Sequence, residues 1–193
     1  MEKYAVLSLK YVLKELGEEK CRKLLSHFYC KQDADIEKYI RDTSIDNIKK
    51  NLAVTFLVVH TDGTVPYLAG FFTLVSKYVE VPKCKLTHKT QSKLERYATY
   101  YEDKETYGLA IPLIAQLAKN SACPNLISGD DLLEIACKKV EEAQAVIGGK
   151  FVYIERDDSE ILKEFYERNG FSEFGERTSD NGRKLIQMLK LLQ

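Results

Sequence analysis

The chain has 193 residues, of which 45% are hydrophobic, a length and composition that fit one globular domain with a sizeable core. Lys and Arg together number 29, and so do Asp and Glu, so no net positive charge is present to hold nucleic acid non-specifically. An acidic partner would therefore need a local basic patch. We expect a single domain over residues 1–193.

The cysteines argue against a disulfide framework and against a zinc site. They are odd in number, scattered and without a CxxC pair: Cys21, Cys30, Cys84, Cys123 and Cys137. The three histidines are equally dispersed, so no metal is expected. The N-terminus has no secretory signal, and no run of about 18 apolar residues occurs. These features predict a cytoplasmic protein with reduced thiols and no membrane partner.

The first third of the chain predicts helices followed by a β-hairpin. Residues 14–28 carry apolar side chains at helical spacing, which is typical of an amphipathic helix, and residues 33–40 indicate a second, shorter helix. Residues 53–60 are rich in β-branched and aromatic side chains, and a turn at 61–64 separates them from a second strand at 67–75. We therefore expect an antiparallel strand pair after the helices.

An insert at about residues 76–108 differs in composition from the rest. It holds five of the twelve tyrosines, and between Lys83 and Arg96 it has five basic residues against Glu95 alone. We expect a long connection with a helical piece near residues 91–101. Lysine and arginine neutralise phosphates and tyrosine stacks on bases, so one interpretation is recognition of an acidic substrate. The favoured alternative is a lid or a dimer contact whose tyrosines pack on the sheet.

Strands and helices alternate in the second half of the chain. In order, we expect a strand at 109–119, a loop at 123–128, a helix at 128–147, a strand at 150–155, a helix at 158–169 and a strand or short helix at 184–192. Pro112 keeps the first residues of its strand at an edge or bulge. Ser128 opens a capping box, Gly148 and Gly149 end that helix, and Gly170 closes the next one. The buried face of the helix at 128–147 is expected at Leu132, Ala136, Val140, Ala143 and Ile147.

A candidate anion-binding site lies at the start of the helix that follows Ser128. The first N–H groups of a helix have no internal partners and its dipole is positive there, so the loop through Asn125 and the start at Gly129 could bind phosphate. A strand-helix-strand crossover also places this helix start beside the strand ends, where ligands bind in open α/β sheets. A plain capped helix is the alternative, because Asp130 and Asp131 would repel a pyrophosphate.

A second candidate is the run from Phe165 to Phe171. It places Tyr166 on the end of a helix that Gly170 terminates. A phenol has a pKa of about 10, which suits it to donate a proton to a departing thiolate rather than to act as a base near neutrality. The alternative is that Phe165, Tyr166 and Phe171 are core aromatics.

Together these two runs resemble the GNAT superfamily of acyl-CoA-dependent N-acetyltransferases. Its members have a strand, a phosphate-binding loop with an R/Q-x-x-G-x-G/A signature and a long helix, then a strand and a helix that ends in a tyrosine-containing stretch before Gly-Phe. Phe165 to Phe171 fits the second motif, whereas Pro124 and Ile127 replace the Arg or Gln and the first Gly of the signature. The resemblance runs from about Tyr29 to Gly175. It implies an α/β fold with a mixed, mostly antiparallel sheet, splayed parallel strands and flanking helices.

The resemblance implies acetyl-CoA as the co-substrate and no metal. The positions that match the pantetheine strand and the phosphate loop are Leu117, Ala118, Lys119, Asn125, Leu126, Ile127, Ser128, Gly129 and Asp130. It further implies direct transfer of the acetyl group to a primary amine in a ternary complex, with Tyr166 as the general acid. Because Ile127 departs from the signature, a non-catalytic binding module with an eroded CoA site stays open as the alternative.

Within the superfamily the chain is most similar to the branch that includes the aminoacyl-tRNA-acetylating toxins and their housekeeping relatives. The matching runs are Phe28-Tyr29-Cys30, Gly70 to Leu74 and Ile111 to Lys119. The acceptor amine is left open between a small molecule and a macromolecule; tRNA is not favoured by net charge, and a homodimer is also open. The amine would lose its proton to water or to a carboxylate, and Glu155, at a strand end, is the carboxylate to test first, with a merely solvated side chain as the alternative.

Overall fold

The computed structural model describes residues 3–61 and 66–192. The chain divides into two compact units, the first formed by residues 1–75 and 115–136 and the second by residues 76–114 and 137–193. Strands β3 (Tyr67–Pro82) and β5 (Thr106–Lys119) and helix α6 (Gly129–Ile147) each contribute residues to both units. The expected single domain stays a prediction.

A mixed sheet forms the framework of the fold. Its strand order is β1-β2-β3-β5-β6-β8-β7, with β4 (Thr99–Tyr101) paired to β5 outside this path. The pairs β1–β2, β2–β3, β4–β5, β6–β8 and β7–β8 are antiparallel. The pair of β5 with β6 (Phe151–Asp157) is parallel and consists of Leu113 with Tyr153 and Ile114 with Ile154. The predicted α/β class with a mixed, mostly antiparallel sheet is confirmed.

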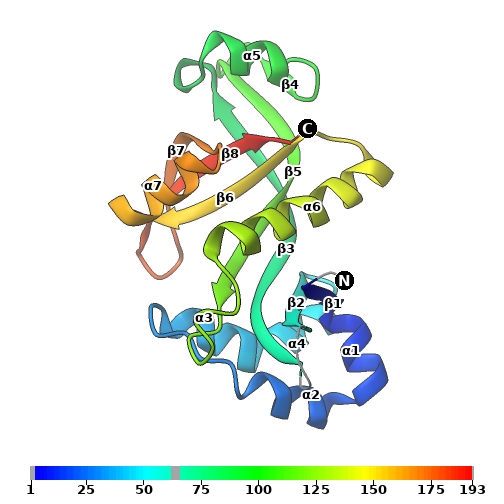
Figure 1. Cartoon of the computed structure of the whole chain (residues 1–193). Coiled ribbons are helices and arrows are strands. Elements are labelled where there is room, and N and C mark those ends of the chain that lie inside the picture. The colour runs from blue at the N-terminus through cyan, green and yellow to red at the C-terminus, as the bar shows by residue number, and fades with distance from the viewer. Residues whose placement is uncertain (1–2, 62–65, 193) are drawn as a thin grey trace. The chain divides into compact units, whose positions relative to one another are not determined.

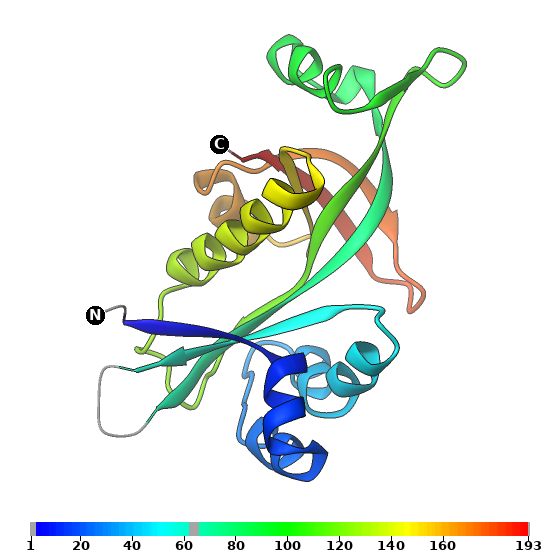
Figure 2. The same ribbon diagram turned by 90° about the vertical axis from the view of Figure 1, so that its right-hand side faces the viewer.

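In the first unit, helices cover one face of the strands (Figures 1 and 2). The unit contains β1 (Tyr4–Ser8), β2 (Val54–His60), α1 (Leu9–Leu16), α2 (Glu18–Leu25), α3 (Ala34–Lys38), a π-helical turn at Tyr39–Thr43 and α4 (Ser44–Lys49). Leu9 of α1 and Leu25 of α2 pack with Leu57 of β2 and Phe71 of β3 in a buried cluster. Removal of these apolar side chains from water holds the helices on the strands.

The sequence predicted much of this unit but missed two features. The hairpin of β2 and β3 is confirmed, although Asp62, Gly63 and Thr64 of its predicted turn lie outside the described residues. Strand β1 was not predicted. The helix expected at 14–28 is two helices, because Gly17 has φ of +76°, a conformation that ends α1 and that glycine adopts without strain.

In the second unit, β6 pairs with β8 (Lys184–Leu191), and β8 pairs with β7 (Ser172–Thr178). Figure 1 shows α7 (Glu160–Arg168) beside these strands. The buried side chains include Tyr153 and Ile154 of β6, Phe174 of β7 and Met188 of β8. The last strand, which the sequence left open between strand and helix, is therefore a strand.

The insert is built differently from the long connection that was expected. Strand β3 continues to Pro82 and β5 begins at Thr106, so much of the insert extends these two strands. Helix α5 (His88–Leu94) and β4 lie at their end (Figure 1). The helical piece thus ends before residue 95 rather than spanning 91–101.

Helix α6 starts and stops where the sequence predicted, but its buried face shifts near the end. Leu132, Ala136 and Val140 are buried as expected, and Gly148 and Gly149 both have positive φ after its last turn. Ala143 and Ile147 are exposed, and Gln144 is buried instead. The buried Gln144 side chain is satisfied by a hydrogen bond of 2.7 Å from its Nε2 to the carbonyl oxygen of Phe151.

Candidate functional site

The predicted pantetheine strand is the end of β5 in the first unit. Leu117, Ala118 and Lys119 are its last residues, and Ala118 is buried. A Cβ atom at Gly70 of β3 would lie 2.9 Å from the carbonyl oxygen of Ala118 and 3.1 Å from Leu132 of α6. Only glycine fits there without a backbone shift, so Gly70 lets the strands and the first turn of α6 pack closely.

Two side chains hold the middle of the loop between β5 and α6. The Tyr4 hydroxyl of β1 donates to the Leu126 carbonyl at 2.8 Å, and Lys119 Nζ donates to the Pro124 carbonyl at 3.2 Å. These bonds satisfy loop carbonyls that would otherwise need water. The loop therefore has a defined path between β5 and α6.

Asn120 connects the strand end to the chain ahead of α3. Its side-chain oxygen accepts from the N–H groups of Tyr29 and Ala122, both at 3.1 Å, and its Nδ2 donates to the Leu68 carbonyl at 3.0 Å. Asn120 is only 5% exposed, and these bonds match its donor and acceptor groups well. This buried amide fixes the backbone where the predicted cofactor strand ends.

The start of α6 has the features of an anion-binding helix end. Ser128 Oγ accepts from the Asp131 N–H at 3.0 Å, which confirms the predicted cap. The N–H groups of Gly129 and Asp130 precede the first intrahelical bond and are thus oriented outward along the axis. Ile127, which replaces a signature glycine, is 2% exposed and packs inward.

Tyr166 lies in the last turn of α7, in the second unit. The helix ends in a Schellman motif: the Phe171 N–H donates to the Tyr166 carbonyl at 3.0 Å and the Gly170 N–H to the Glu167 carbonyl at 2.9 Å. Gly170 has φ of +84°, as this motif requires. The phenol ring is packed edge-on against Phe165 and Phe171, with centroids 4.9 and 5.6 Å away.

The environment of Tyr166 keeps its hydroxyl protonated. Burial, helped by the neighbouring Cys137, raises the pKa of Tyr166 to about 12, while the charge of Arg156 acts in the opposite direction. A phenol in this state can donate a proton or a hydrogen bond and cannot serve as a base near neutrality.

Glu155 is neither free nor merely solvated. Its carboxylate accepts hydrogen bonds from the Tyr153 hydroxyl and from Nε and Nη2 of Arg177, and Gln187 Nε2 donates to the Tyr153 hydroxyl at 2.9 Å. Burial would raise the pKa of Glu155, but the bonds from Arg177 and Tyr153 outweigh it and lower the pKa. The carboxylate is therefore ionised at neutral pH and holds a proton weakly.

The predicted site residues fall into two groups, one in each unit. Leu117 to Lys119 and Asn125 to Asp130 lie together at the junction of β5 and α6 in the first unit, and Tyr166 and Glu155 belong to the second. Sequence reasoning missed Tyr4 and Asn120, which bond to the predicted cofactor loop and to the strand end before it. The only signals were a short β-prone run at residues 4–8 and a turn-forming Asn directly after a strand.

Among residues 3–61 and 66–192, no group of three or more His, Cys, Asp or Glu side chains is placed to hold a metal ion. No helix in these same ranges is long and apolar enough to cross a membrane.

Comparison with known proteins gives matches at the level of structure. No family model and no curated protein sequence matches the chain. A tyrosine-to-phenylalanine mutant of KacT aligns with a TM-score of 0.65 and 17% identity over 96% of this chain and 94% of that one. AtaT complexed with acetyl-methionyl-tRNAfMet aligns with a TM-score of 0.66 and 14% identity over 95% and 93%. The chain has the fold of the GNAT toxins KacT and AtaT.

A third structure with this GNAT toxin fold contains the expected co-substrate. AtaTR bound with AcCoA aligns with a TM-score of 0.58 and 13% identity over 96% of this chain and 93% of that one. The AtaT toxin has also been solved bound to the C-terminus of the antitoxin AtaR. At these identities the likeness establishes the fold, and the predicted GNAT-like architecture is confirmed.

Proposed function

We propose that the protein is an acetyl-CoA-dependent N-acetyltransferase. The observation that supports this most directly is Tyr166, a protonated phenol fixed at a helix end between two phenylalanine rings. The capped start of α6 and the fixed loop before it supply backbone N–H groups suited to phosphate. These residues fit acetyl-CoA, which enters the reaction as a substrate. The free thiols of all five cysteines agree with the expected cytoplasmic location.

The reaction is direct transfer. The amine nitrogen attacks the thioester carbonyl, the C–N bond forms, and the C–S bond breaks with its electron pair on sulfur. Tyr166 gives its proton to this thiolate and regains one from water, while the amine loses its proton to water or to a carboxylate. The products are the N-acetylated acceptor and CoA.

Thermal unfolding with acetyl-CoA tests whether the co-substrate binds. A ligand that binds only the native state stabilises it by about 2.7 kcal/mol at one hundred times Kd, which for a chain of this size raises Tm by about 5–11 °C. An unchanged Tm at saturating acetyl-CoA would overturn the proposal that the protein is an enzyme and would leave the alternative, a binding module on the same scaffold.

Substitution of Tyr166 tests the proton donor. We expect Tyr166→Phe to lower kcat by about 10²-fold or more, because general acid catalysis contributes at least that much, and to leave acetyl-CoA affinity unchanged. Tyr11→Phe is the matched control, since Tyr11 is 60% exposed on α1. An unchanged kcat in Tyr166→Phe would remove Tyr166 from this role.

Glu155 is the proposed proton acceptor for the amine, and its pairing with Arg177 gives the test. Arg177→Met leaves the carboxylate in place and frees it, whereas Glu155→Gln removes it. A loss of kcat in Glu155→Gln alone supports the role. Equal losses in both variants would assign the pair to structure.

For the acceptor, we propose that the amine of an aminoacyl-tRNA be tested first. Tyr78, Tyr100 and Tyr101 of the insert are exposed, and Lys83 and Lys104 lie over the rings of Tyr100 and Tyr101 at 5.3 and 6.0 Å. Such basic, aromatic surfaces suit phosphates and unpaired bases. Salt-dependent tRNA binding that is lost on charge reversal of Lys85, Lys89 and Lys93 would support this acceptor, and unchanged binding would favour a lid or a dimer contact.

A further inference from the structure

Arg156 of β6 is a buried cation with incomplete compensation. Its side chain is 2% exposed, and its carboxylate partner, Glu173, is half-exposed at 3.4 Å. Its Nε donates to the sulfur of Met188 at 3.3 Å, and a thioether is a weak acceptor. A buried guanidinium costs free energy unless it is well paired, so these partners alone do not explain why the charge lies there.

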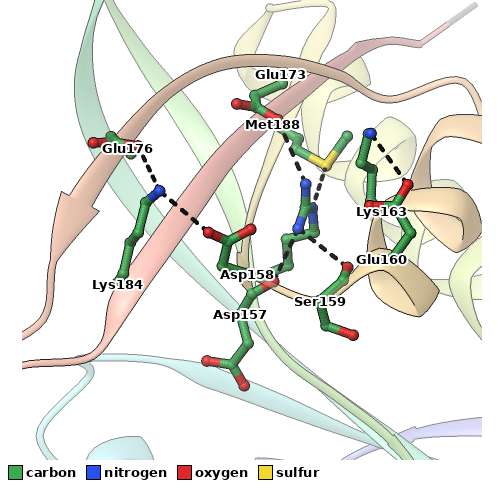
Figure 3. Close-up of polar contacts among 10 residues, drawn as sticks. Asp157, Asp158, Ser159, Glu160, Lys163, Glu173, Glu176, Lys184 and Met188 are labelled. Carbon is green, nitrogen blue, oxygen red and sulfur yellow. Dashed lines mark hydrogen bonds and ion pairs between the residues drawn. The ribbon is translucent and has the colours of Figure 1, made fainter.

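The remaining donors of Arg156 hold the turn that leads into α7. Its Nη1 donates to the carbonyl oxygens of Asp157 at 2.9 Å and Ser159 at 3.4 Å, and Figure 3 shows these partners around the guanidinium. Ser159 is the N-cap of α7, yet its own side chain makes no capping bond. The guanidinium therefore fixes a helix start that lacks the usual cap.

The two ends of α7 are thus fixed by different means. The Schellman motif fixes the C-terminal end, where Tyr166 lies, and Arg156 fixes the N-terminal end against β7 and β8 through Glu173 and Met188. The titratable neighbours of the Tyr166 phenol are Cys137 of α6 and Arg156 of β6, and Arg156 is the cation that favours the phenolate. Arg156 thus bonds to the start of the helix whose last turn carries Tyr166, and its charge acts on the Tyr166 phenol.

We propose that Arg156 is a positioning residue for Tyr166. Its guanidinium holds the first turn of α7 on β6, β7 and β8, and its charge stabilises the phenolate that remains when Tyr166 transfers its proton. This role rests on the proposed function, because it matters for turnover only if Tyr166 is the proton donor.

Steady-state kinetics of three variants with acetyl-CoA tests the proposal. Arg156→Met keeps the length of the side chain without its charge, Arg156→Lys keeps the charge, and Lys163→Met removes an exposed positive charge from the same helix. We expect kcat to fall about 10-fold or more in Arg156→Met, to recover within about 3-fold in Arg156→Lys, and to stay within about 2-fold in Lys163→Met, with acetyl-CoA affinity unchanged throughout. Equal losses in the Met and Lys variants of Arg156, or a retained kcat in Arg156→Met, would overturn the role.

A second measurement needs no activity. With 3,5-difluorotyrosine, a stronger acid than tyrosine, at position 166, fluorine NMR reports the pKa of this phenol directly. The pKa should rise in Arg156→Met and stay unchanged in Lys163→Met; an unchanged value in Arg156→Met would overturn the coupling even if the wild type proves inactive as an acetyltransferase. Should Arg156→Met not fold, the pKa of the phenol at position 166 is measured in Arg156→Lys and Glu173→Gln instead. The pKa should change more in Glu173→Gln, which removes the charge partner of Arg156, than in Arg156→Lys. An unchanged pKa in both variants would overturn the proposal.

Discussion

At the scale of residues, buried polar side chains connect segments of the fold that the sequence does not show to be neighbours. Asn120 links the strand end to two backbone segments, and Arg156 holds a helix start. Glu155 lies between Tyr153 and Arg177. For Asn120 and Glu155 the donors and acceptors match, which offsets the cost of removing these groups from water, whereas the charge of Arg156 is only partly compensated.

The Glu155 pair predicts a pH-dependent contribution to stability. Because Arg177 and Tyr153 lower the pKa of Glu155 below its usual value of 4.5, the unfolded chain binds more protons in that range, and the pair stabilises the fold above it. The contribution is lost as the pH falls through the lowered pKa. We therefore expect urea unfolding to show a stability gap between wild type and Arg177→Met at neutral pH that narrows in acid.

A matched control separates this gap from a general effect of charge. Lys163 forms an exposed pair with Glu160 at 3.2 Å, and such pairs contribute little, so Lys163→Met should unfold like the wild type at both pH values. A gap for Arg177→Met that is as large in acid as at neutral pH would contradict the assignment.

At the scale of elements, local signals predicted starts and stops better than packing. The cap at Ser128, the glycines after α6 and Gly170 after α7 are all confirmed, because each follows from backbone geometry within a few residues. The division of the first helix at Gly17 was missed because the apolar spacing continues through it.

Local sequence patterns could not predict contacts between elements that are distant in the sequence. The buried Gln144 on α6 bonds to Phe151 of β6, and the pairing of Arg177 with Glu155 follows from the register of β6, β8 and β7. The aromatic run at Tyr166 could be found because all its members lie in one short motif. The loop proposed for the cofactor follows from a local motif and stays a prediction, whereas the contacts of Tyr4 and Asn120 with this region come from distant parts of the chain.

The cap of α6 gives a prediction at this scale. Ser128→Ala removes the acceptor for the Asp131 N–H and should lower the free energy of unfolding by about 1 kcal/mol. Ser92→Ala is the control, because Ser92 Oγ only donates to the His88 carbonyl within α5 and alanine favours a helix. Urea unfolding followed by circular dichroism measures both, and equal losses would show that the cap does not set the stability of α6.

At the scale of the whole molecule, the two compact units share their framework. Strands β3 and β5 and helix α6 each supply residues to both, so neither unit has a complete set of elements of its own. If a shared strand or helix unfolds in one unit, the other unit loses the part of its structure that this element supplies. We therefore expect the chain to unfold in one cooperative transition, as small single domains usually do.

Hydrogen exchange can measure this in each unit separately, which suits a chain without tryptophan. Leu132 is buried on the part of α6 that belongs to the first unit, and Leu132→Ala should cost about 2–5 kcal/mol. If unfolding is cooperative, the slowest amides of β6 and β8 in the second unit lose the same free energy of protection as those of β2 in the first. Val146→Ala, at an 85% exposed position on the same helix, should change neither. Protection lost from β2 alone would mean that the units open independently, because the shared elements would then fail to transmit the loss.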